Sequence, residues 1–413
     1  MEFQLTGKGI PHENSIFDIG LLHTTIMPHA GPVLKRPNAA YRIVGYIGPR
    51  TGHARGQLAG EIMEPLESSG TSVATPIQRF IWDLTYACPL RCVHCYSESG
   101  RRPARMLDRD GMLRVVQVMI AAKPSRVSFG GGEPLLTPWW DEAAALLGAA
   151  GIPVTVFISG WVMNEDLADR LVASMAAVTV SVDGPDERVH DAIRGRAGSF
   201  RRALAALDSL GRAKLARAAR SQSHARLGVD YTVTRSGFGG LEDFVAEASS
   251  RFPNLDYLRF GAAIPAGLGE EAAFVDRELL SDDELTALVD AEPRLAARAR
   301  NGVEVSVTDV RGFLPSSPRS AEGEGIAQLE PDGQLRAFAC YEAKVGSVLD
   351  EPIDVLWDRA LAWRNTPFVR EQTRSIRNLG DWARVARVLD RRYGSAADKA
   401  RIAGRTGPAP QPS

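Results

Sequence analysis

Three of the four cysteines in this 413-residue sequence lie close together, as Cys88, Cys92 and Cys95. The CxxxCxxC spacing lets three thiolates on one loop converge on one centre, and thiolate is a soft ligand that suits zinc or an iron–sulfur cluster. A structural zinc site takes four closed ligands, and the nearest fourth candidate, His94, is adjacent to Cys95, so the two are poorly placed to share one ion. A [4Fe–4S] cluster held by three cysteines keeps one iron open for a substrate or cofactor. We therefore favour the cluster over zinc, and both over a chance grouping of cysteines.

The overall composition is that of a soluble globular protein, with 44% hydrophobic and 24% charged residues. The 49 basic and 50 acidic side chains give a net charge of −1, so nucleic-acid or membrane-surface binding is not predicted from charge. No apolar run approaches the roughly 20 residues that span a bilayer. The first residues lack the basic region and apolar core of a secretory signal, which favours a cytoplasmic protein. Four cysteines are too few for a disulfide scaffold.

Short apolar runs alternate with amphipathic segments from about residue 79 onward. This alternation predicts an α/β fold with parallel strands and right-handed crossovers, either an open doubly wound sheet or a barrel. The expected helix at 282–299 is interrupted near Pro293. The predicted strands are 79–84, 126–131, 153–159, 177–183, 226–234 and 255–261, and the predicted helices are 112–122, 141–150, 165–175, 199–210, 239–250 and 282–299.

The pattern differs on both sides of this series, which predicts further domains. Residues 1–75 are expected to form an N-terminal extension, and residues 76–300 the α/β core. Residues 301–395 predict a small α+β region, with two short strands around the turn Pro331-Asp332-Gly333 and two later helices. The Gly- and Pro-rich end, 396–413, predicts a disordered tail.

Polar and glycine residues follow several of the predicted strands, at the edge where α/β folds place their chemistry. After the second strand come Gly130-Gly131-Gly132-Glu133, where glycines let the backbone approach a ligand closely and the carboxylate can accept from an ammonium group. The alternative is a plain connector between a strand and a helix. Other polar residues at such positions are Ser159 after the third strand, Ser181 at the fourth, and Arg194 in the stretch His190-Asp191-Ala192-Ile193-Arg194-Gly195.

Together these motifs resemble the radical S-adenosylmethionine (SAM) superfamily over about residues 79–300. The resemblance implies a partial (β/α)6 TIM-like barrel, with one [4Fe–4S] cluster on the three cysteines. It further implies a SAM site. In that site Gly131, Gly132 and Glu133 hold the amino group, and Ser159 contacts the ribose. Ser181 and Arg194 bind the carboxylate, and His94 lies beside the adenine.

The same resemblance implies the chemistry. One electron from the reduced cluster cleaves SAM, and the 5′-deoxyadenosyl radical abstracts hydrogen from an unactivated carbon; an external donor such as flavodoxin or ferredoxin supplies the electron. The Ser181-Val182-Asp183-Gly184 and 190–195 stretches are similar to the peptide-modifying and sulfatase-maturase branch, which implies epimerisation or crosslinking of a ribosomal peptide in natural product biosynthesis. The alternatives are a sugar or aminocyclitol substrate and, more remotely, a non-catalytic Fe–S or zinc module.

The fourth cysteine, Cys340, lies in a segment similar to the start of a SPASM domain, from the turn at 331–333 to Trp357. A SPASM domain carries about seven cysteines for auxiliary clusters, and one thiol cannot hold such a cluster. We therefore expect a degenerate SPASM or twitch region without auxiliary clusters. Cys340 is a candidate catalytic residue that donates a hydrogen atom to a substrate radical; the alternatives are a remnant packed as a small apolar residue and a substrate contact.

Overall fold

A ten-stranded sheet organises the part of the chain that the computed structural model describes, residues 75–314 and 325–405. The sheet lies within the unit Thr71–Ser413. The predicted N-terminal extension therefore lies outside the described residues. Within the described ranges, no helix is long and apolar enough to cross a membrane.

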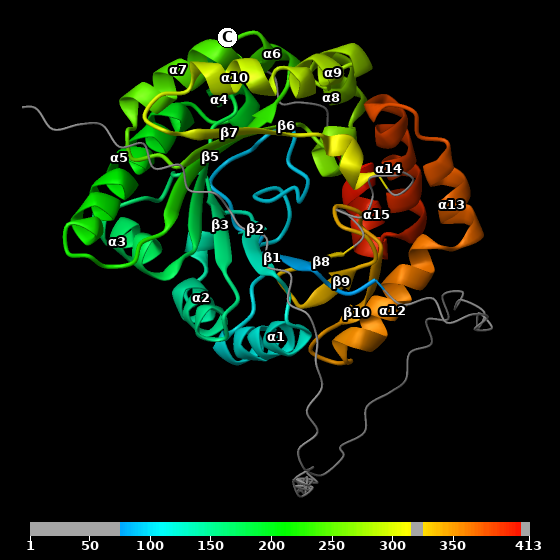
Figure 1. Cartoon of the computed structure of the whole chain (residues 1–413). Coiled ribbons are helices and arrows are strands. Elements are labelled where there is room, and N and C mark those ends of the chain that lie inside the picture. The colour runs from blue at the N-terminus through cyan, green and yellow to red at the C-terminus, as the bar shows by residue number, and fades with distance from the viewer. Residues whose placement is uncertain (1–74, 315–324, 406–413) are drawn as a thin grey trace, which may run out of the picture. The chain divides into compact units, whose positions relative to one another are not determined.

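The sheet runs in the order β10-β9-β8-β1-β2-β3-β4-β5-β6-β7. From β8 to β7 neighbouring strands pair in parallel, whereas β9 pairs antiparallel with both β8 and β10. The predicted α/β class is confirmed, and the sheet curves without closing, so β10 and β7 are its edges (Figure 1). The strands are β1 (Arg79–Thr85), β2 (Arg126–Gly131), β3 (Val154–Ile158), β4 (Ala177–Ser181), β5 (Arg226–Val233), β6 (Tyr257–Ala262), β7 (Glu304–Thr308), β8 (Ile326–Leu329), β9 (Gln334–Arg336) and β10 (Lys344–Ser347).

Helices cover the outer face of the curved sheet (Figure 1). Side chains cap many of them, as Asp108 does for α1 and Asn164 for α3. The interruption expected near Pro293 is present, because α9 ends at Asp290 and α10 begins at Glu292 with proline in its first turn. The helices of the parallel region are α1 (Arg109–Ala122), α2 (Trp140–Ala149), α3 (Glu165–Ser174), α4 (Glu187–Arg194), α5 (Ser199–Ala218), α6 (Arg235–Phe238), α7 (Leu241–Arg251), α8 (Ala272–Arg277), α9 (Asp282–Asp290) and α10 (Glu292–Arg298), with single 3-10 turns η1 (Pro134–Leu136), η2 (Gly267–Glu270) and η3 (Val310–Phe313).

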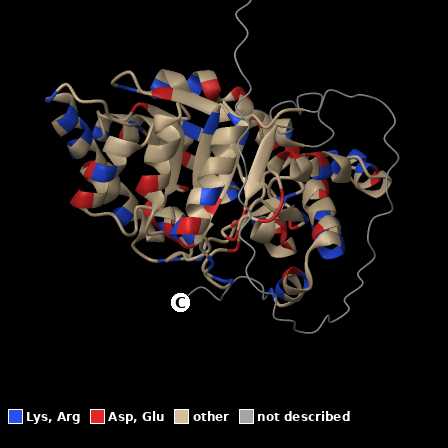
Figure 2. Cartoon of the chain, turned by 90° about the horizontal axis from the view of Figure 1, so that it is seen from below, with Lys and Arg blue, Asp and Glu red and all other residues tan. Residues whose placement is uncertain are grey.

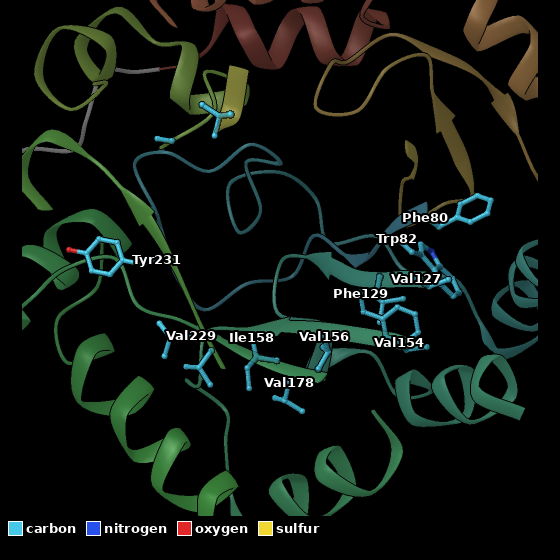
Figure 3. Packing of buried hydrophobic residues seen from close by; sticks show 14 of the residues in the cluster. Phe80, Trp82, Val127, Phe129, Val154, Val156, Ile158, Val178, Val229 and Tyr231 are labelled. Atoms are coloured by element: carbon cyan, nitrogen blue, oxygen red, sulfur yellow. The ribbon is translucent and has the colours of Figure 1, made fainter. Parts of the chain in front are cut away.

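The main core lies between the sheet and these helices. Figure 3 shows Val156, Ile158, Val178 and Val229 on the helix-facing side of adjacent strands, where all four are fully buried or nearly so. Burying each such side chain contributes roughly 1.5–3 kcal/mol, which fixes which face of every strand turns outward. The residues between them therefore face the inside of the curved sheet, where polar side chains such as Thr155, Thr179 and Asp230 lie together with the aromatic Phe157.

The predicted boundary at residue 300 does not divide the sheet. β7, at 304–308, pairs in parallel with β6, and β8 pairs in parallel with β1. The region expected as a separate subdomain therefore extends the core sheet at both edges. It adds the helices α12 (Ile353–Arg364), α13 (Pro367–Arg374) and α14 (Leu379–Tyr393).

The predicted disordered tail, 396–413, is wrong for its first ten residues. Residues Ala396–Ala403 form helix α15, because Ser395 and Asp398 build a reciprocal capping box at its start. Arg405, just beyond the helix, forms buried ion pairs with Glu98 and Glu270. The prediction of disorder extended the Gly- and Pro-rich composition of 406–413 to the helix that precedes it. That helix is stabilised by these tertiary contacts. Residues 406–413 themselves lie outside the described part.

Candidate active site

Cys88, Cys92 and Cys95 lie on the segment that follows β1, called here the cysteine loop. This loop begins at the carboxyl end of β1, at the edge of the sheet where the parallel strands end. Cys92 is buried, and Cys88 and Cys95 are half-buried. Burial, followed by the negative charge of Cys92, raises the pKa of Cys88 to about 12. Burial also raises the pKa of Cys92, although Arg194 opposes the shift. The thiols of Cys88 and Cys92 therefore ionise only against strong positive charge, which a bound metal centre supplies.

The glycine motif after β2 docks directly on the cysteine loop. Gly132 N donates to Thr85 O at 2.7 Å, and Glu133 N donates to Ala87 O at 2.9 Å. A Cβ atom on Gly132 would lie 2.1 Å from Ala87 O and 3.2 Å from Cys88 Cβ, so only glycine permits this approach. The structure therefore joins two motifs that the sequence separates by about 40 residues.

Glu133 is fully buried and points its carboxylate at the end of β3. Its Oε2 accepts from Ser159 N at 3.0 Å and from the Ser159 hydroxyl, and its Oε1 lies 3.5 Å from Leu135 N. Burial raises the pKa of Glu133, and the hydrogen bonds from Ser159 oppose that shift. In the described ranges no Lys or Arg forms an ion pair with this carboxylate. It is a buried acceptor able to take a cationic group such as an ammonium.

Asp183, directly after β4, joins two of the predicted cofactor-binding residues. Its Oδ2 lies 2.6 Å from Arg194 Nε and 3.3 Å from His94 Nε2. Its Oδ1 accepts from Thr232 N at 3.0 Å. Asp183 is fully buried, and although burial favours its neutral form, the charge of Arg194 holds its pKa below the ordinary value. Asp183 thereby fixes the orientation of both side chains.

The end of helix α4 packs on the cysteine loop. Arg91 N donates to Arg194 O at 3.1 Å, and Val93 N donates to Ile193 O at 2.9 Å. Arg194 Nη1 lies 3.9 Å from Cys92 Sγ. Gly195 ends the helix in the left-handed region at φ 64°, where a Cβ would lie 2.3 Å from Arg91 O. Arg194 therefore stands between Asp183 and the cysteines, with one face toward the sulfur of Cys92.

A chain of hydrogen bonds connects the glycine motif with Cys340. Gly131 N donates to the Tyr96 hydroxyl at 3.2 Å, and that hydroxyl donates to Asp83 Oδ1 at 2.7 Å. Gln328 Nε2 donates to Asp83 Oδ2 at 2.9 Å, and Cys340 N donates to Gln328 Oε1 at 2.7 Å. Burial raises the pKa of Asp83 to about 6. The backbone of Cys340 is thus tied to the cysteine loop through β1 and β8.

Cys340 itself adopts a left-handed backbone conformation, with φ at 70°, which is uncommon for a residue with a side chain. It is half-buried, and burial raises the pKa of its thiol to about 12, so Cys340 is a neutral thiol at pH 7. A neutral S–H is the form from which a hydrogen atom can be transferred. The strained backbone and the bond to Gln328 hold this thiol in a defined place.

Ser181 lies in a row of polar residues on the inside of the sheet. It pairs in register with Asp230 of β5, which in turn pairs with Arg259 of β6. Leu258 and Phe260, on either side of Arg259, are fully buried in the helix-facing core, so this row faces the opposite, inner side. Burial raises the pKa of Asp230 to about 6, against the lowering charge of Arg259. No contact in the described ranges joins Ser181 to the other predicted cofactor-binding residues, so Ser181 is placed only by this register.

Asp183, Tyr96, Asp83 and Gln328 were not among the predicted site residues. Asp183 lies within a stretch that the sequence already marked, and Tyr96 directly follows the last cysteine. Asp83 has the clearest signal, because it is the one polar residue within the apolar run 80–84 of β1. Gln328 has no local signal, since its role arises only when β8 pairs with β1.

The side chains gathered at this site suit an iron–sulfur cluster bound by the cysteine loop and a second, small-molecule ligand bound beside it. Three thiols share the loop, a buried carboxylate lies against it, and an arginine faces one sulfur. In residues 75–314 and 325–405, no three His, Cys, Asp or Glu side chains are gathered as for a single metal ion.

The comparisons with known proteins agree with this chemistry. The model of the radical SAM superfamily matches residues 82–222. Mycofactocin maturase MftC of Mycobacterium ulcerans is 34% identical over 298 residues, which cover 68% of this chain and 75% of the relative. The chain therefore belongs to the radical SAM superfamily and is an enzyme, and the family implies a [4Fe–4S] cluster and SAM as cofactors.

Two further similarities are to a second curated relative and to a solved structure. An AdoMet-dependent heme synthase of Methanosarcina barkeri is 23% identical over 303 residues, covering 68% of this chain and 82% of the relative. Among solved structures, Streptococcus suis SuiB bound to S-adenosylmethionine matches with a TM-score of 0.53 at 13% identity, covering 73% of this chain and 69% of that one. The structural match supports the predicted fold.

Proposed function

We propose that this enzyme is a maturase that modifies a peptide substrate by radical chemistry. The named maturase among its relatives, at 34% identity over three quarters of its length, supports a peptide rather than a small metabolite. The observation that supports this assignment at the level of residues is the docking of Gly132 and Glu133 on the cysteine loop, since a buried carboxylate then lies beside the three cysteines proposed as cluster ligands.

In this proposal Cys88, Cys92 and Cys95 hold the cluster. When bound, the cluster and SAM supply a one-electron cleavage that generates a radical able to take hydrogen from an unactivated carbon. The protein binds and orients SAM and keeps water away from that step. The residues proposed to hold SAM are His94, Gly131, Gly132, Glu133, Ser159, Ser181 and Arg194.

The contacts give four of these residues a task. The Glu133 carboxylate takes the amino group, and Ser159 holds that carboxylate in place through its N–H and hydroxyl. Arg194 offers a guanidinium fork to the SAM carboxylate while Asp183 fixes its other side. His94 is held against Asp183 beside the cysteine loop, and burial lowers its pKa to about 4, so it presents a neutral ring to the adenine.

The substrate is proposed to enter the inside of the curved sheet. Asp230 and Arg259 lie side by side there, one acidic and one basic. Arg259 can receive a carboxylate, and Asp230 an amide N–H or an ammonium group of a peptide. In this proposal the reacting carbon of the substrate lies between SAM and the thiol of Cys340.

Cys340 is proposed as the hydrogen-atom donor. As its S–H bond breaks and a C–H bond forms on the substrate carbon, the thiol is left one electron and one proton short. An external one-electron donor and a solvent proton restore it, so the substrate undergoes no net oxidation. In deuterated water the product of the wild-type enzyme is expected to carry one solvent deuterium, and Cys340→Ala to form no such product. A product without solvent deuterium rejects this role.

The proposed function is tested by anaerobic reconstitution of the full chain, with iron counting and detection of 5′-deoxyadenosine under dithionite. About four irons and 5′-deoxyadenosine are expected, and an intact cluster without SAM cleavage contradicts the proposal. The peptide assignment is tested by mass spectrometry of a short precursor peptide encoded beside the gene. SAM cleavage that this peptide neither stimulates nor consumes favours a sugar, an aminocyclitol or another small substrate.

A further inference from the structure

Three exposed arginines lie directly on the cysteine loop: Arg91, Arg101 and Arg196. We propose that these three residues, called here the arginine face, are the docking surface for an acidic one-electron carrier protein. The proposal rests on the proposed function, since only an enzyme that reduces a cluster needs such a carrier.

The arginine face is built on the backbone of the loop. Arg91 Nη1 donates to Leu90 O at 3.0 Å and to Cys88 O at 3.3 Å. Arg101 donates to Cys92 O at 3.1 Å and to Arg91 O at 2.5 Å. These bonds hold two guanidinium groups over the residues that separate the first two cysteines.

Arg196 approaches the same loop from the segment after α4. Its Nη1 donates to Pro89 O at 2.5 Å, and its guanidinium carbon lies 3.7 Å from the ring centre of Trp161. Cation–π stacking and the carbonyl bond fix this side chain while its charge stays exposed. Three segments of the chain thus each place one guanidinium group on the outer side of the cysteine loop.

The three charges are not balanced by acids. In residues 75–314 and 325–405, none of the three arginines forms an ion pair with a carboxylate, and each bonds to carbonyl oxygens instead. The nearby Glu98 is buried and paired with Arg401 and Arg405. This arrangement differs from the outer helices, where Lys and Arg lie interleaved with Asp and Glu (Figure 2). A protein of net charge −1 has therefore concentrated uncompensated positive charge over its proposed redox centre.

Such a surface suits an acidic protein partner. Charge complementarity steers a carrier toward the patch and orients it, mainly by raising the association rate. A carrier seated on this loop brings its redox group close to the cysteines, and the inner side of the sheet stays free for SAM and substrate. An acidic segment of the peptide substrate is the competing occupant, and the experiment separates the two.

The test compares two electron sources on the reconstituted full chain. Dithionite is a small reductant that needs no docking surface, whereas an acidic flavodoxin with its reductase does. The double variant Arg91→Gln/Arg196→Gln removes two charges, and Arg91→Lys/Arg196→Lys keeps them. Arg101 is left intact because its bonds to Cys92 O and Arg91 O join parts of the loop nine and ten residues apart, whereas Arg91 bonds only to carbonyls within three residues of itself. Arg220→Gln is the matched control: it is exposed and lies between α5 and β5, at the opposite end of the strands.

With dithionite, all variants are expected to form 5′-deoxyadenosine at the wild-type rate. With flavodoxin, the Gln double variant is expected to lose about tenfold in kcat/KM for the carrier, chiefly through KM. The Lys double variant and Arg220→Gln are expected to stay within about threefold of the wild type. Raising the ionic strength should weaken the flavodoxin reaction of the wild type far more than that of the Gln variant.

Several results overturn the proposal. An equal loss with both electron sources shows that the arginines act on the loop or cluster itself. An unchanged flavodoxin reaction shows that the carrier docks elsewhere. A weaker affinity for the peptide with an unchanged KM for flavodoxin assigns the face to the substrate. If the wild type itself cleaves no SAM with dithionite, the proposed function fails, and that outcome is distinct from a failure of the arginine face.

Discussion

Arg405 Nη2 lies 2.7 Å from Glu98 Oε1, and this ion pair ties the end of the described chain to the segment that directly follows the cysteine loop. Both side chains are only 3% exposed. Glu98 has a left-handed backbone conformation, with φ at 51°, so the loop needs tertiary contacts to hold it. The same arginine also pairs with Glu271 at 2.9 Å and with Glu270.

Arg405→Met is expected to destabilise the folded protein by about 3 kcal/mol and to lower the iron bound per chain, because it removes the cation paired with the buried Glu270 and leaves Glu98 with Arg401 alone. Thermal unfolding and iron counting after anaerobic reconstitution check both effects. Arg391→Met, an exposed position on α14, is the control and should change neither. Full iron content in a destabilised Arg405 variant would show that this ion pair stabilises the fold without shaping the loop.

Gly132→Ala is expected to abolish most cluster loading, since its Cβ would lie 2.1 Å from Ala87 O, a backbone atom of the cysteine loop. The matched control is Gly148→Ala in helix α2, where a Cβ has no atom within 4 Å. That change should leave loading intact and stabilise the protein by up to about 1 kcal/mol. The measurement is iron content with the visible absorption of the cluster. Wild-type loading of the Gly132 variant argues against close packing of the two loops.

Asp183→Asn is expected to weaken SAM binding by about tenfold, because an amide no longer fixes the Arg194 guanidinium or compensates its charge. Titration calorimetry of SAM into the reconstituted enzyme measures the change. Asp186→Asn is the control: Asp186 is an exposed helix cap in the same segment, and asparagine caps equally well. Equal SAM affinities for both variants reject a positioning role for Asp183.

His190 predicts a pH dependence of stability. Its Nδ1 accepts from Asp183 N at 3.1 Å, so the ring is neutral, and burial lowers its pKa from the ordinary 6.5 to about 4. Between pH 4 and pH 6.5 the His190 ring is therefore protonated in the unfolded chain and neutral in the folded chain. His190 therefore contributes stability fully above about pH 6.5, and that contribution falls by up to about 3 kcal/mol as the pH approaches 4.

The comparison that isolates this effect is the wild type against His190→Gln, whose amide oxygen can also accept from Asp183 N. Urea unfolding of both proteins at several pH values between 4.5 and 7.5 gives the difference in the free energy of unfolding. The difference should shift in favour of the variant as the pH falls. Groups with raised pKa, such as Asp83, act in both proteins and cancel. A difference that is constant with pH contradicts the neutral, buried histidine.

The sequence by itself was enough to predict the family and the α/β class, and it singled out the three cysteines as proposed cluster ligands. The reason is local: CxxxCxxC and Gly130-Gly131-Gly132-Glu133 are contiguous segments, and alternating apolar runs report strands and helices directly. The interruption near Pro293 and the turn at 331–333 were predicted correctly for the same reason.

Other features could be decided only by the tertiary structure. Asp183 gains its role when β4 brings it between His94 and Arg194, and Gln328 reaches Asp83 only because β8 pairs with β1. The helix at 396–403 and the ion pair of Arg405 with Glu98 depend on residues about 300 positions apart in the chain. Such contacts form between side chains that no local pattern connects. The sequence therefore specifies the chemical groups, and the packing of distant segments decides which of them are held together.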